Sequence, residues 1–159
     1  MRHLNWALPL ASVAALAWIV LALAPQLAAQ SAGAAAFDLR PFGYSLAEAQ
    51  AYLAVLTPQG ARLYLGTFRL ADTLVPLLLT PTLCLPLRGR GQLWFLPALV
   101  YGLLDLWENL AIARLIHLGP DVDAQAVALA SSLTQAKFAA LAVAVLLALH
   151  GLWTAWRER

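Results

Sequence analysis

Hydrophobic residues along this chain gather in four long blocks, which shorter polar segments separate. The blocks cover residues 6–29, 61–85, 92–118 and 124–156. Each is long enough for an α-helix to cross the hydrocarbon core of a bilayer, which takes about 20 residues. The pattern therefore predicts an all-α integral membrane protein, with residues 1–159 folded as one domain, a four-transmembrane-helix bundle.

The polar segment between the first two blocks, residues 30–60, contains a pattern typical of a short helix. Ser45 and Glu48 have the spacing of a capping box, in which the serine side chain and the glutamate side chain each accept a backbone N–H. Apolar residues then follow on one helical stripe at positions 46, 49, 53 and 56. We expect a short extra helix over residues 45–56 in the first outer loop. A solvated connector and a lid over the bundle are both consistent with this pattern.

Cations in the short loops predict the orientation of the bundle. One side carries Arg2, Arg88, Arg90, Arg157 and Arg159, whereas the opposite loops carry only Arg40 and Arg62 as clear cations. Lys and Arg are enriched in cytoplasmic loops. We therefore expect an inner-membrane protein with both termini cytoplasmic and the 30–60 loop on the outer side.

Composition narrows the classes of function. The chain is 62% apolar and 11% charged, with a net charge of +2, whereas soluble domains are about 25% charged. No basic cluster exists beyond Arg88 and Arg90, so no nucleic-acid partner is expected. Cys84 is the single cysteine, which excludes an internal disulfide. The sequence has no metal-ligand motif, P-loop or dinucleotide fingerprint, so neither metal nor cofactor is expected.

Ionisable residues lie inside the second and third blocks, at a depth where a charge is costly. Arg69 and Asp72 are one helical turn apart. Pro76 lacks the N–H that would bond the carbonyl of Asp72. In the third block Asp105 and Glu108 fall on one helix face, together with Tyr101, Asn109 and Ile112, while Trp107 and Arg114 point the opposite way. Intramembrane ionisable residues are functional candidates by default.

The fourth block carries Gln135 and Lys137 on different helix faces, so only one of them can face the acids squarely. At about 1.5 Å of rise per residue, all these polar groups fall in the middle or outer half of the spans. Because charges avoid hydrocarbon, we expect them to converge inside the bundle. The predicted ligand-binding residues are Arg69, Asp72, Tyr101, Asp105, Glu108, Asn109, Gln135 and Lys137.

Three functions fit this pattern. The first is binding or handling of a small amphipathic or lipid-like ligand from the membrane. The second is an enzyme on a hydrophobic substrate, with isomerase- or hydrolase-like acid–base chemistry and with Glu108, Asp105 and Asp72 as catalytic residues. The third is an accessory or assembly subunit of a larger membrane complex. The alanines at positions 140, 144 and 148 form a stripe that also suits a homo-oligomer.

Four spans with carboxylates inside the bundle resemble the plan of the sterol-isomerase and sigma-2-receptor group of membrane proteins. The resemblance is one of general plan. It assigns no residue of this chain a role, because no motif is shared residue by residue.

Overall fold

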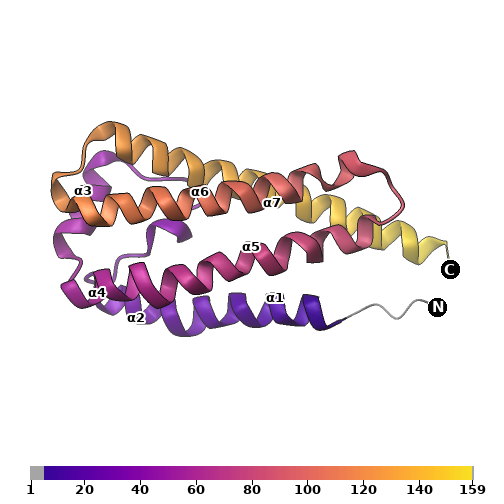
Figure 1. Ribbon diagram of the computed structural model, residues 1–159, viewed down its shortest axis with the longest axis horizontal. Helices are drawn as coiled ribbons and strands as arrows, with labels where there is room; N and C mark the ends of the chain where they lie inside the picture. Colours follow the sequence, from indigo (N-terminus) through magenta and orange to yellow (C-terminus); the bar gives the residue numbers. More distant parts are fainter. Residues whose placement is uncertain (1–5, 159) are drawn as a thin grey trace.

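The computed structural model describes residues 6–158, which form an elongated bundle of four long helices (Figure 1). The described residues are almost entirely helical and contain no strand. All four helices are long and apolar enough to cross a membrane. The predicted all-α fold with four such helices is therefore confirmed.

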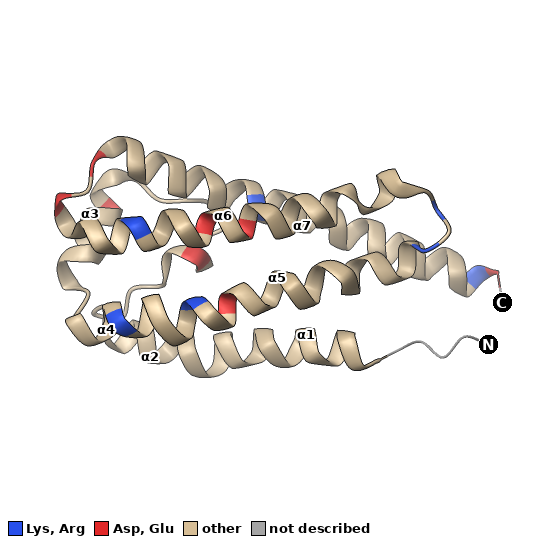
Figure 2. Cartoon of the chain, in the orientation of Figure 1, with Lys and Arg blue, Asp and Glu red and all other residues tan. Residues whose placement is uncertain are grey.

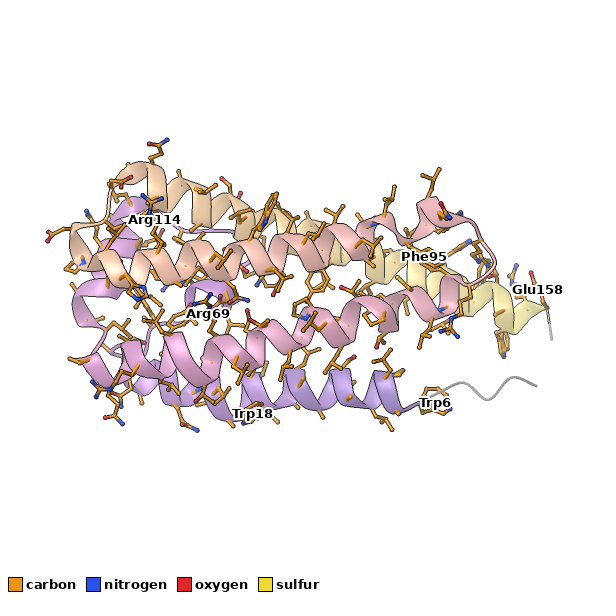
Figure 3. The ribbon with its side chains drawn as sticks, viewed as in Figure 1. Trp6, Trp18, Arg69, Phe95, Arg114 and Glu158 are labelled. Atoms are coloured by element: carbon orange, nitrogen blue, oxygen red, sulfur yellow. The ribbon has the colours of Figure 1, made fainter. Side chains whose placement is uncertain are left out.

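The first long helix, Ala7–Ala29, consists of α1 (Ala7–Trp18), a π-helical turn and α2 (Ala24–Ala29). The second, Pro58–Leu87, contains α4 (Pro58–Leu63), a π-helical turn (Tyr64–Phe68) and α5 (Arg69–Cys84). The third, Gln92–Asp121, is mostly α6 (Leu96–Leu118), and the fourth is α7 (Ala124–Arg157). Consecutive long helices pack side by side, and Trp6 and Glu158 lie at the same end of the bundle (Figure 3).

Helix boundaries follow from capping residues. Ser45 begins α3 (Leu46–Val55), and its side chain and that of Glu48 form both halves of the capping box. Asp123 begins α7, because its carboxylate accepts the N–H of Ala126 at 2.8 Å. Both arrangements satisfy backbone donors that have no partner inside a helix.

Prolines mark the second long helix at its start and in its interior. Thr57 caps α4 and Pro58 is its first residue, so this helix begins three positions before the predicted start at residue 61. Proline suits this position because its missing N–H would have no helical partner there. Further along, α5 continues through both Pro76 and Pro81.

The segment between α2 and α3 was expected to be a wet connection, but part of it folds back into the bundle. Ala36, Phe37 and Asp38 are all buried, and Phe37–Leu39 forms a single 3₁₀ turn. Aromatic rings continue this packing into the second helix, from Phe37 through Tyr52 and Tyr64 to Phe68. We call residues 34–44 the inserted loop.

Candidate functional site

Lys137 forms the centre of a buried charge cluster. Its ammonium lies 3.1 Å from Asp105 Oδ1 and also pairs with Glu108 Oε2. Lys137 is 4% exposed and Glu108 has no exposed surface. Among residues 6–158 these are the only ion pairs. Since buried charges are stable only when paired, this contact fixes α6 against α7.

Glu108 is fully enclosed by its neighbours. Thr134, one turn before Lys137 on α7, donates its hydroxyl to Glu108 Oε1 at 2.5 Å. Lys137 contacts the other carboxylate oxygen. A side chain with no exposed surface borders no space that a water molecule could enter. Glu108 therefore belongs to a dry wall of the cluster.

Asp72 on α5 is the acid with the fewest partners. It is buried, and its Oδ2 has no hydrogen-bond partner. No cation lies within ion-pair distance of it in the described residues. It interacts electrostatically with Asp105, Glu108 and Lys137, so all three long helices α5, α6 and α7 face the same interior region. Figure 2 shows charged positions on α5, α6 and α7 at similar distances along the long axis of the bundle.

Asp38 is a fourth acid of this region. Only 2% of Asp38 is exposed, although it belongs to the polar segment 30–60 that was predicted to lie outside the spans. The Tyr64 hydroxyl donates to Asp38 Oδ2 at 2.5 Å and accepts the N–H of Phe37 at 2.9 Å. Asp38 also interacts electrostatically with Asp72 and Glu108. The apolar residues 34–37 just before it were the one signal of insertion in the sequence.

Side chains of α7 hold the other end of the inserted loop. Ser131 accepts the N–H of Tyr44 at 2.9 Å, and Gln135 donates to the carbonyl of Phe42 at 2.9 Å. Gly43 lies between these contacts with a φ of +78°, and a Cβ there would collide with both Ser131 and Gln135. Glycine is needed here both for the left-handed backbone and for this close approach.

Arg40 lies against the aromatic residues of the loop region. Its guanidinium is 5.3 Å from the Phe37 ring centroid and 5.2 Å from that of Tyr52. It donates two hydrogen bonds to the carbonyl of Ala35. Burial raises the pKa of Tyr52 to about 12 and that of Tyr44 further, so both phenols are neutral at physiological pH.

Most of the predicted site residues converge, but two have different surroundings from those expected. Asp72, Asp105, Glu108 and Lys137 meet as described, and Tyr101 and Asn109 are buried on the same face of α6. Trp107 and Arg114 on the opposite face are exposed, as the helical spacing predicted.

Arg69 and Gln135 are the two exceptions, because neither side chain bonds an acid of the cluster. Arg69 lies between α5 and α6 (Figure 3) and borders a gap beside Asn109 that has no room for water. It makes no ion pair within the described residues, so it does not neutralise Asp72. Gln135 is exposed on α7 and binds the inserted loop instead of the acids.

The charges of this region do not balance. Of the four acids Asp38, Asp72, Asp105 and Glu108, only the last two have a cation within ion-pair distance among the described residues, the ammonium of Lys137. Carboxylates buried without a partner either bind protons or attract a cation. The region thus favours a positively charged group or protons.

An apolar groove begins one helical turn from Asp72. It measures about 370 Å³ and lies between α5 and α6, where it is lined by Pro76, Leu77, Thr80, Leu99, Gly102 and Leu106 among others. Gly102 leaves room beside Thr80, since a Cβ there would lie 2.7 Å from Thr80 Oγ1. The volume is within the range of sites for small molecules, about 300 to 1,000 Å³.

Comparison with known proteins gives no match to a family model, to a curated protein or to a solved structure. Within residues 6–158 no three histidine, cysteine, aspartate or glutamate side chains are grouped so that they could hold a metal ion. Function is inferred below from the geometry around Asp72.

Proposed function

We propose that this chain is an inner-membrane protein that crosses the bilayer four times, with both termini in the cytoplasm. Arg88 and Arg90 in the loop between α5 and α6, and Arg157 at the end of α7, support this orientation. Figure 2 shows this loop and the end of α7 at the bundle end where both described chain ends lie. The positive-inside rule assigns such an end to the cytoplasm. The inserted loop and α3 then lie toward the outer side.

We further propose that it binds a small amphipathic or lipid-like molecule whose polar end is positively charged. The observation that carries this proposal is Asp72: a buried carboxylate with an unpartnered oxygen, one turn from an apolar groove. The groove suits a hydrocarbon chain or ring system, and the excess of acids suits a cationic group. A desolvated ion pair with Asp72 would be far stronger there than in water.

The other acids have different parts in this proposal. Tyr101 and Asp105 are buried on the same face of α6 as Glu108, and in this proposal they complete the polar end of the site. Glu108 has no exposed surface, so it and Lys137 form the rear wall, which holds α6 and α7 in register. This arrangement favours ligand binding over a catalytic role for Glu108.

The proposal is tested with the full-length protein purified in a neutral detergent. Dodecylamine and dodecanol share one alkyl chain, and only the first is cationic near neutral pH. We expect dodecylamine to raise the thermal unfolding temperature of the protein and dodecanol to raise it much less. The variant Asp72→Asn should lose the difference between the two probes.

Asp121→Asn is the matched control, since Asp121 is an exposed acid in the turn before α7. It should keep the preference for the amine. Equal stabilisation by amine and alcohol would refute the proposal, as would a preference that survives Asp72→Asn.

A further inference from the structure

A second groove adjoins the first along the α5–α6 seam, toward the basic end of the bundle. It measures about 300 Å³ and shares Pro81 and Leu99 with the first groove; its other lining residues are Leu8, Cys84, Leu85, Arg88 and Phe95. Apart from the Cys84 thiol, its walls are apolar except for one guanidinium, that of Arg88. Arg88 follows Asp72 by sixteen positions, which in a helix corresponds to about 24 Å. This groove is therefore distinct from the polar end of the proposed ligand site.

Arg88 has no anionic partner among the residues that the structure describes. It is exposed and makes no ion pair within residues 6–158. Glu158 is the only acid described near this end, at the last described position of the chain (Figure 3). An unpaired guanidinium at the mouth of an apolar groove complements an anion that carries a hydrocarbon chain.

The neighbouring cations are already held by aromatic rings. The Arg90 guanidinium lies 5.5 Å from the Trp94 ring centroid and bonds the hydroxyl of Thr154. The Arg157 guanidinium lies 4.0 Å from the Trp153 ring centroid. Tryptophan and arginine together are typical of the level of lipid headgroups. Arg88 is thus the cation of this group that is left to meet a ligand.

We propose that the groove binds an anionic phospholipid of the cytoplasmic leaflet, with its phosphate on Arg88 and one acyl chain between α1, α5 and α6. Arginine suits this role because its planar N–H groups bind two phosphate oxygens at once. Basic pockets between helices on the cytoplasmic side are known to select anionic headgroups. The inference rests on the membrane insertion proposed above and is independent of the site at Asp72.

The test uses the full-length protein reconstituted into vesicles of phosphatidylcholine with a minor fraction of spin-labelled lipid. One series carries the label on phosphatidylglycerol and the other on phosphatidylcholine. We expect the motionally restricted fraction to be larger for phosphatidylglycerol. Arg88→Gln should lower the relative affinity for phosphatidylglycerol about fivefold, the effect of one interfacial arginine.

Two further variants separate the groove from general charge. Arg114→Gln removes an exposed arginine near the other end of α6 and should leave the preference unchanged. Leu8→Trp fills part of this groove at a residue that does not line the first groove. It keeps every charge, and it should also reduce the preference. Inorganic phosphate should not compete, because it has no acyl chain.

The proposal is overturned if phosphatidylglycerol shows no preference, if Arg114→Gln and Arg88→Gln act alike, or if Leu8→Trp has no effect. Full competition by inorganic phosphate would also overturn it, since the headgroup alone would then suffice. Co-flotation of the protein with plain phosphatidylcholine vesicles reports membrane insertion separately. Failure of lipid selection can therefore be distinguished from failure to insert.

Discussion

The hydroxyl of Tyr64 donates a hydrogen bond of 2.5 Å to the carboxylate of Asp38, across 26 positions of the chain. Tyr64 belongs to the second long helix and Asp38 to the inserted loop. The same hydroxyl accepts the backbone N–H of Phe37. One phenol hydroxyl is thus the hydrogen-bond partner of both a carboxylate and a backbone N–H in a buried segment. Tyr64 is therefore a principal anchor of the inserted loop.

We expect Tyr64→Phe to destabilise the protein by about 1 to 3 kcal/mol, because a buried acceptor and a buried donor lose their partner together. Thermal unfolding in detergent measures the loss. A double-mutant cycle with Asp38→Ala separates the pair from general packing. Additive effects of the two substitutions would contradict the coupling.

Lys137→Met should be more damaging than the loss of the tyrosine hydroxyl. It leaves Asp105 and Glu108 buried without a cation, and breaking a buried pair in this way costs about 3 to 5 kcal/mol. Adding Glu108→Gln should restore part of the stability, since it removes one of the uncompensated charges. Arg114→Met, at an exposed position, is the control and should change the unfolding temperature little. A double variant no more stable than Lys137→Met would argue against charge as the cause.

Gly43→Ala should detach the inserted loop from α7. The substitution meets two obstacles, a left-handed φ of +78° and a collision with Ser131 and Gln135. Gly33→Ala is a close control because Gly33 has a φ of +83° but open space around it. We expect the control to cost about 1 to 2 kcal/mol from backbone strain alone and Gly43→Ala to cost more. Equal losses would mean that the contact with α7 contributes nothing.

The capping box of α3 predicts a pH dependence. The backbone N–H and hydroxyl of Ser45 bond the Glu48 carboxylate and hold its pKa below the usual range. The unfolded chain therefore binds a proton more readily, so this contribution is complete above the usual glutamate pKa and is lost as pH falls through the folded pKa.

Hydrogen exchange of the α3 amides, corrected for intrinsic rates, measures this effect. Protection should decrease as the pH falls from about 5 to about 3. Glu48→Gln should remove that pH dependence, because glutamine keeps a hydrogen-bond acceptor and cannot titrate. An unchanged pH profile in the variant would assign the effect to another group.

The long helices and the buried face of α6 could be predicted from the sequence alone. The length of each hydrophobic block identifies a long helix, and i, i+3 and i+4 spacing places Asp105 and Glu108 on one side of α6 with Trp107 on the other. Local patterns of this kind depend only on helix geometry.

The inserted loop could not be derived in the same way. Its contacts join residues far apart in the chain, such as Phe42 and Gln135, which are 93 positions apart. The segment has no periodicity that would indicate which side is buried. The orientations of the Arg69 and Gln135 side chains could likewise not be predicted from local sequence patterns, because they depend on how neighbouring helices are rotated about their axes.

The attachment of the loop to α7 has a consequence for biogenesis. Residues 34–44 are synthesised long before Ser131 and Gln135 exist as partners. The contacts of Phe42 and Tyr44 with α7 therefore form only after the last helix has joined the other three, whereas the bond between Asp38 and Tyr64 needs only the second helix. The loop is thus attached in two stages, and a chain truncated before α7 would lack the second attachment.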